Sequence, residues 1–70
     1  MDKMAIGKNI HRRLLINGVT QKKLAEEIHV TQATMSRWMN GERNPSVYAL
    51  YRVAKYLGAT MEELMEGIEG

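Results

Sequence analysis

The chain has 70 residues, a length that fits one domain with a small core, and it contains no cysteine for a disulfide or a thiolate metal site. No apolar run approaches the roughly 20 residues that span a bilayer, and no apolar segment of a signal peptide follows residues 1–4. A single domain over residues 1–70, cytoplasmic and without a membrane partner, is therefore expected.

The charges are distributed unevenly along the chain. All ten Lys and Arg residues lie within positions 3–55, and residues 1–58 hold four acids, so that this part carries +6 while the whole chain carries +2. The other four acids occupy the last nine positions: Glu62, Glu63, Glu66 and Glu69. A basic body with an acidic end favours a polyanionic partner for one face. Ordinary solvated charges explain the same pattern, so charge alone does not decide.

Turn residues divide the chain into five predicted helices, over about 3–16, 21–28, 32–39, 47–57 and 61–66. A Thr or Ser precedes each of the last four in the N-cap position: Thr20, Thr31, Ser46 and Thr60. No segment alternates with a period of two, so an all-α fold is expected. The apolar positions at helical spacing predict the core: Ile6, Ile10, Leu14, Leu24, Ala25, Ile28, Met35, Trp38, Met39, Val47, Leu50, Val53, Ala54, Leu57, Met61, Leu64 and Met65.

The connection between the second and third helices consists of residues 29–31 alone. Such a short link between two short helices forces a sharp crossing, which is the geometry of a helix-turn-helix. Helices of about eight residues are not stable by themselves, so this pair is expected to pack on the first and fourth helices.

The starts of the helices differ in charge. The fifth begins with the capping box Thr60-Met61-Glu62-Glu63, whose acids suit the positive end of a helix. The second begins with Gln21, Lys22 and Lys23, an unfavourable arrangement that an external phosphate would compensate. Glu26 and Glu27 at helical spacing would compensate it equally well, so both interpretations stay open.

The exposed face of the third helix is expected to carry Gln32, Ala33, Thr34, Ser36 and Arg37, with no acid among them. In the major groove Gln pairs well with adenine, Arg with guanine, and a small apolar group with the thymine methyl. This composition favours the reading of base edges, although polar surface helices are common.

Other chemistry has little support in the sequence. The two histidines, His11 and His29, lie on different elements without a partner at metal-ligand spacing, and His11 is interpreted as a surface residue. The Ser and Thr residues are mostly explained as helix caps, and no Gly-rich phosphate loop occurs. The methionines suit core filling better than an adaptable groove. Neither enzyme activity, a metal, a cofactor nor a small-molecule ligand is expected.

The ordered string Thr20-Gln21-x-x-Leu24-Ala25-x-x-x-His29-Val30-Thr31-x-x-x-Met35-Ser36-x-Trp38-x-Asn40-Gly41-x-x-x-Pro45 resembles the lambda-repressor-like, Cro-type (XRE-like) helix-turn-helix family. The continuation Leu50-x-x-Val53-Ala54-x-x-Leu57-Gly58-x-Thr60-x-x-x-Leu64 is similar to its last two helices. The match covers about residues 4–66. It implies a compact five-helix domain that binds double-stranded DNA in the nucleoid.

The resemblance also implies roles for matching positions. In that family the start of the third helix reads base edges, which assigns this role to Gln32, Ala33, Thr34 and Arg37. Contacts to DNA phosphates are implied for Gln21, Lys22, Thr31, Ser36, Asn40 and Arg43.

Two positions depart from the family pattern. His29 stands where the turn usually has Gly at a positive φ, a conformation that His tolerates at a cost of about 1 kcal/mol. Leu14 and Met39 replace an Arg and a Glu that often form a buried ion pair, and we expect an apolar contact between them instead.

The leading hypothesis is a small transcriptional regulator, with repression favoured, that binds a palindromic operator as a homodimer with half-sites about 34 Å apart. The alternative is an antitoxin or adaptor that binds another protein. Its contact surface, which could equally be a dimer interface, would be Met61, Leu64, Met65 and Ile68.

Overall fold

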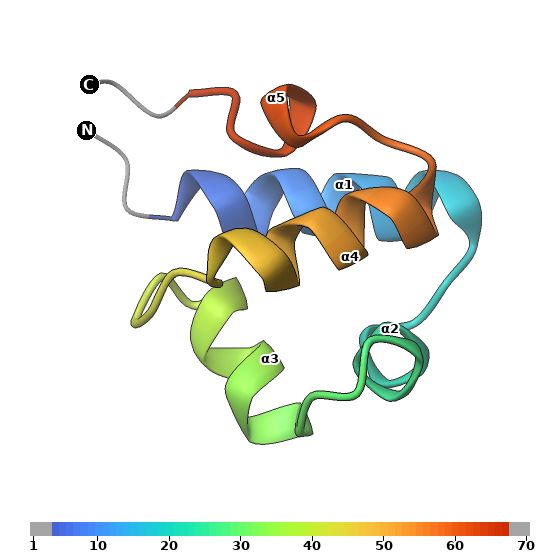
Figure 1. Cartoon of the computed structure of the whole chain (residues 1–70), viewed down its shortest axis with the longest axis vertical. Coiled ribbons are helices and arrows are strands. Elements are labelled where there is room, and N and C mark those ends of the chain that lie inside the picture. Colours follow the sequence, from blue (N-terminus) through green and yellow to red (C-terminus); the bar gives the residue numbers. More distant parts are fainter. Residues whose placement is uncertain (1–3, 68–70) are drawn as a thin grey trace.

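The computed structural model describes residues 4–67 of the chain, and these residues form helices joined by short turns, with no strand in the described range. The all-α fold predicted from the sequence is confirmed. The helices, labelled in Figure 1, are α1 (Ala5–Asn17), α2 (Gln21–Glu27), α3 (Gln32–Met39), α4 (Val47–Leu57) and α5 (Met61–Leu64).

The boundaries of α3 and α4 match the sequence prediction, whereas those of the other helices differ by a few residues. Helix α1 ends one residue late, and of the two residues expected before Ala5, Met4 is the N-cap and residue 3 lies outside the described range. Helix α2 ends before Ile28, which is its C-cap. Helix α5 is two residues shorter than expected because Met65 already leaves the helix as its C-cap.

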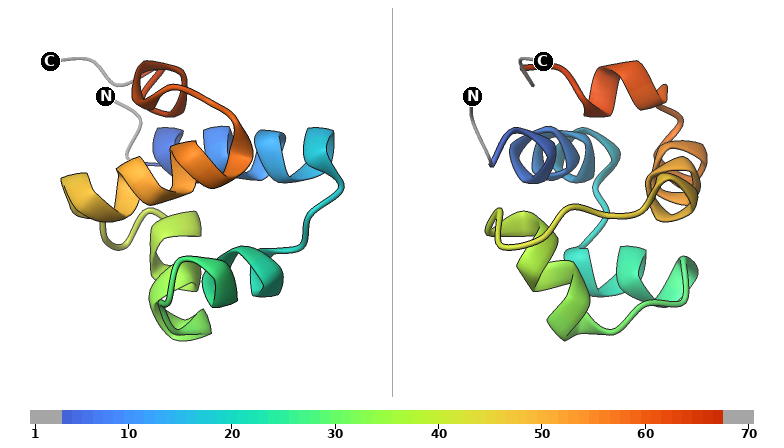
Figure 2. Two further views of the ribbon diagram at one scale, coloured as in Figure 1. Left: turned by 45° about the vertical axis from the view of Figure 1, so that its right-hand side comes forward. Right: turned by 60° about the vertical axis from the view of Figure 1, so that its left-hand side comes forward.

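Helices α1 and α4 lie side by side, with the α2–α3 pair on one side of them and α5 on the other (Figures 1 and 2). Helix α1 packs against α3, α4 and α5, and α2 packs against α3 and α4. One apolar cluster joins all five helices: Ile6, Ile10, Leu14, Leu24, Ala25, Ile28, Met35, Trp38, Leu50, Val53, Ala54, Leu57 and Leu64. Met39 packs against the cluster that contains Leu14, and a direct contact between these two residues stays a prediction.

Two predicted core residues face solvent instead. Val47 is 72% exposed because it is the first residue of α4, where the apolar stripe that continues through Leu50 runs past the edge of the core. Met65 is 43% exposed because the chain has left α5 at that position. Met61, also predicted to be inward, is half-buried against the cluster.

Helix α1 approaches the end of α3 without a side chain between them. Gly7 is buried, and a Cβ atom placed on it would lie 2.6 Å from the carbonyl oxygen of Met39 and 2.9 Å from that of Trp38. Both neighbours are backbone atoms, which cannot rotate away as a side chain can. The absence of a side chain at position 7 therefore sets the distance between α1 and α3.

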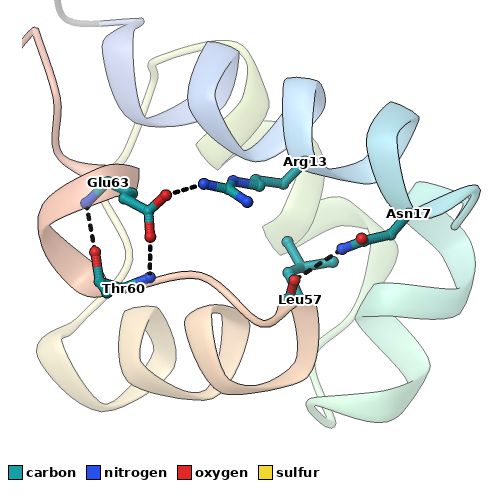
Figure 3. A network of polar contacts seen from close by, with 5 residues as sticks. All are labelled: Arg13, Asn17, Leu57, Thr60 and Glu63. Carbon is teal, nitrogen blue, oxygen red and sulfur yellow. Dashed lines mark hydrogen bonds and ion pairs between the residues drawn. The ribbon is translucent and has the colours of Figure 1, made fainter.

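Polar contacts attach α5 to α1 (Figure 3). The Thr60 hydroxyl accepts a hydrogen bond from the Glu63 amide while the Glu63 carboxylate accepts one from the Thr60 amide, which is the predicted capping box. The same carboxylate is paired with Arg13 of α1. The buried Asn9 side chain donates hydrogen bonds to the carbonyls of Leu64 and Glu66, at 2.8 and 2.7 Å. A helix of four residues is thus held by tertiary contacts.

Replacement of Gly7 by Ala is expected to lower the free energy of unfolding by about 1–3 kcal/mol, because the new methyl group overlaps the backbone of α3. Urea unfolding followed by the fluorescence of Trp38, the single tryptophan of the sequence, measures this change. Helix propensity alone predicts the opposite sign, a gain of up to about 1 kcal/mol. A more stable Gly7→Ala variant would contradict the close approach.

The capping box makes stability depend on pH in the acid range. Hydrogen bonds from the backbone amide of Thr60 and from its side chain, and then the charge of Arg13, hold the pKa of Glu63 below its ordinary value of 4.5. The stabilisation is therefore present above pH 4.5 and is lost as the pH falls through the lowered pKa. Wild type is expected to melt at a higher temperature than Glu63→Gln at pH 7, and the two melting temperatures should converge as the pH falls through the lowered pKa of Glu63. A difference that persists at low pH would contradict this origin.

Candidate nucleic-acid interface

The turn between α2 and α3 is a helix end with the Schellman pattern of hydrogen bonds. The amide of His29 donates to the carbonyl of Glu26 at 3.3 Å, and the amide of Val30 donates to that of Ala25 at 3.0 Å. His29 occupies the left-handed position with φ of 60°, the only positive φ of a residue other than glycine in the described range. The expected positive φ at this position is confirmed, and the turn keeps its geometry without glycine.

Helix α3 has one buried and one exposed side. Met35 and Trp38 are buried in the core, and Met35 has no exposed surface. Because these two residues fix the rotation of the helix, the opposite side faces solvent with four exposed residues and one half-buried residue, Thr34. The exposed residues are Gln32, Ala33, Ser36 and Arg37. The structure thus brings the predicted base-reading residues together on one surface.

The hydroxyl groups at the start of α3 are already used inside the protein. The Thr31 hydroxyl accepts from the amide of Thr34 at 3.0 Å, which makes Thr31 the predicted N-cap. It also donates to the Thr34 hydroxyl at 2.9 Å. Since a hydroxyl has one proton to donate, Thr31 has none left for a phosphate in this arrangement, whereas Thr34 keeps its own proton.

The helix starts show the charge pattern expected from the sequence. The first turns of α2, α3 and α4 have no acid, and that of α5 has Glu62 and Glu63. Lys23 lies 3.9 Å from Glu27 of its own helix, so an internal acid does accompany this lysine. No carboxylate of the described residues is paired with the exposed Lys22. The internal interpretation therefore holds for Lys23, and compensation of Lys22 by an external phosphate stays a prediction.

The predicted phosphate contacts lie around the ends of α2 and α3. Gln21, half-buried, begins α2, and the exposed Asn40 is the C-cap of α3. Met39, the residue before Asn40, lines the same shallow groove as Gln21, so these two helix ends are neighbours. Arg43 is exposed in the following loop. The backbone amides of Glu42 and Arg43 in this loop donate hydrogen bonds to the carbonyl of Arg37.

The predicted partner surface on α5 needs a correction. Leu64 has no exposed surface and belongs to the core, because its side chain points toward the cluster that α5 covers. Met61 is half-buried and Met65 is exposed, while Ile68 lies outside the described residues. The exposed apolar surface of α5 is therefore smaller than expected.

The residues that the structure describes contain no group of three His, Asp or Glu side chains that could hold a metal ion. No helix among them has the length and hydropathy to cross a membrane.

Sequence reasoning missed the groove beside Gln21. Gly7, Lys8 and His11 of α1 line it together with Gln21 and Met39. These residues come from three helices, and no spacing along one helix connects them, so the sequence pattern contains no signal for it.

Comparison with known proteins agrees with this geometry. A sequence model of the helix-turn-helix family matches residues 10–64. The chain is 29% identical over 69 residues to the HTH-type transcriptional activator BcrR of Enterococcus faecalis, covering 99% of this chain and 29% of that protein. It is 33% identical over 60 residues to the uncharacterized HTH-type transcriptional regulator y4dJ of Sinorhizobium fredii, covering 86% of this chain and 78% of that protein.

A crystal structure of an HTH_3 family transcriptional regulator from Vibrio cholerae has the same fold, with a TM-score of 0.77 and 21% sequence identity. The alignment covers 90% of this chain and 35% of that one, so this chain corresponds to about a third of the length of the Vibrio protein. The chain belongs to the helix-turn-helix family, as the resemblance in its sequence indicated.

The left-handed conformation of His29 leads to a prediction about stability. His29→Gly is expected to raise the free energy of unfolding by about 0.5–1 kcal/mol, because glycine adopts a positive φ without steric cost. The β-branched substitution His29→Val should lower it by about 1–2 kcal/mol. Urea unfolding of the three proteins measures both effects, and a valine variant as stable as wild type would contradict the strained turn.

Proposed function

We propose that the chain regulates transcription by sequence-specific binding to double-stranded DNA, with α3 in the major groove. The exposed, acid-free side of α3 is the observation that carries the proposal. Burial of Met35 and Trp38 turns Gln32, Ala33 and Arg37 outward together, and an α-helix fits the width of the major groove. The Gln amide and the Arg guanidinium then hydrogen-bond to base edges, and the Ala methyl suits a thymine methyl.

The phosphate contacts set the orientation of α3 rather than the sequence preference. Gln21 at the start of α2 and Asn40 at the end of α3 would hold the DNA backbone, because they adjoin opposite walls of the shallow groove on the protein surface. Lys22, Ser36 and Arg43 are exposed and add donors or positive charge around the same helices. For Thr31 the proposed role is indirect: its hydroxyl is bonded to Thr34 and so positions the first turn of α3.

Two copies are proposed to bind one palindromic operator. The dimensions support this: the principal extents are 30, 23 and 21 Å, and successive half-sites lie about 34 Å apart. Two domains docked in successive major grooves would therefore come close to each other along the DNA. Met61 and Met65 remain candidates for that contact.

Repression is proposed as the mode of regulation, because occupancy of an operator by the domain is sufficient to exclude other proteins from the same DNA. The relative from Enterococcus faecalis is named an activator. The competing reading, an antitoxin or adaptor that binds protein through α5, loses support because Leu64 is in the core.

A selection of bound sequences from random DNA tests the proposal. Wild type should enrich one motif, and Gln32→Ala/Arg37→Ala should lose preference at two or more positions of that motif, at about 1–3 kcal/mol for each lost contact. Arg52→Ala removes an exposed arginine from α4 and is the matched control that should keep the motif. An unchanged motif in the double variant would refute the role of α3, and no motif for wild type would refute the function.

A further inference from the structure

A shallow groove of about 300 Å³ opens where α1, α2 and α3 meet. Its lining consists of Gly7, Lys8 and His11 from α1, Gln21 from α2 and Met39 from α3. Lys8 and His11 are exposed, one helical turn apart on the same helix. We propose that this groove receives a phosphate of the DNA backbone, and that the contact requires protonated His11, so that DNA affinity depends on pH. This inference rests on the proposed function.

The position of the groove points to the DNA backbone. Gln21 forms one wall, and Met39 of the opposite wall is followed directly by Asn40. A DNA strand that contacts both Gln21 and Asn40 therefore passes across the opening of the groove. His11 and Lys8 are the side chains of α1 that meet it there. The other residues of the lining from α1 and α3, Gly7 and Met39, carry no charge.

The chemistry of the lining makes the proton necessary. A neutral imidazole has one N–H donor, whereas the imidazolium has two donors and a positive charge that strengthens its bond to an anion. Lys8 and His11 are the titratable residues of the lining; α2 contributes Gln21 and α3 contributes Met39, which do not titrate. Since the described lining holds no carboxylate, the phosphate is the anion that would stabilise the imidazolium.

The sign of the pH dependence follows from this stabilisation. If the bound state holds the His11 proton more tightly than the free state, binding takes up protons and strengthens as the pH falls. Histidine side chains ordinarily titrate near pH 6.5. Affinity should therefore increase between pH 8 and pH 5.5, a range in which ordinary carboxylates and lysines keep their charge.

The test measures binding to a duplex carrying the motif selected by wild type, and to a scrambled duplex, by fluorescence anisotropy at constant ionic strength. Wild type should bind about three- to tenfold more tightly at pH 5.5 than at pH 8, as expected for one charged contact at a partly exposed site. His11→Gln should show a flat profile. His11→Arg should be flat and tight at both pH values, because its charge is permanent.

His29→Asn is the matched control, since His29 is the second histidine of the chain and lines a different groove. This variant should keep the wild-type pH dependence. A second readout is the salt dependence: at pH 5.5 the slope of log K against log salt should be steeper by up to about 0.9 than at pH 8 for wild type, and unchanged for His11→Gln.

The outcomes separate this inference from the proposed function. Selective binding with the same pH dependence in wild type and His11→Gln overturns the role of His11 and leaves the function standing. A flat profile in His29→Asn, or a pH-dependent one in His11→Arg, overturns it as well. Equal affinity for the selected and scrambled duplexes refutes the proposed function and with it the inference.

Discussion

The contact between Gly7 and the last turn of α3 determines where α3 lies. Eight residues do not form a stable helix in water, so α3 depends on the surfaces that it packs against. Met35 and Trp38 fix its rotation about the helix axis. The buried Gly7 has no side chain, so the backbone at the C-terminal end of α3 can pack directly against the backbone of α1. The N-terminal turn of α3, with Gln32 and Ala33, then projects farthest from α1 and α4 (Figure 1). A side chain at position 7 would move the proposed DNA-reading surface without changing any residue on it.

The same hydrogen-bond pattern ends α1, α2 and α4, although the residue at its left-handed position differs. Gly18 and Gly58 occupy this position in α1 and α4, and His29 occupies it in α2. In each case the amide of the next residue bonds back to the helix, at 2.9 or 3.0 Å, and that residue packs on the core. Packing of Val30 thus gives a physical reason for the turn to persist after the loss of glycine, because burial of its side chain offsets the strain at His29.

Local signals in the sequence were sufficient for most of the fold. The caps Thr20, Thr31, Ser46 and Thr60 each accept the hydrogen bond expected of them, and the boundaries of α3 and α4 follow from caps and periodicity. Periodicity could not distinguish Val47 from Leu50, since exposure at a helix end depends on where the neighbouring helices stop. It also could not reveal that Leu64 is buried while Met65 is exposed, because four residues of α5 are too few to define a face. The groove at His11 depends on three helices and was beyond any one-dimensional pattern.

Two of the acids near the end of the chain lie away from α3 (Figure 1). Helix α5, with Glu62 and Glu63, lies on the far side of α1 and α4 from α3 (Figures 1 and 2). Asn9 and Arg13, both on α1, keep it there through the carbonyls of Leu64 and Glu66 and the Glu63 carboxylate. Repulsion between a nucleic acid and the acids of α5 is therefore weakest when α3 faces the phosphates. The Debye length is about 8 Å at physiological ionic strength, so that exposed charges farther apart than this are largely screened from each other. The contacts that complete the core thus also favour one orientation of the domain toward DNA.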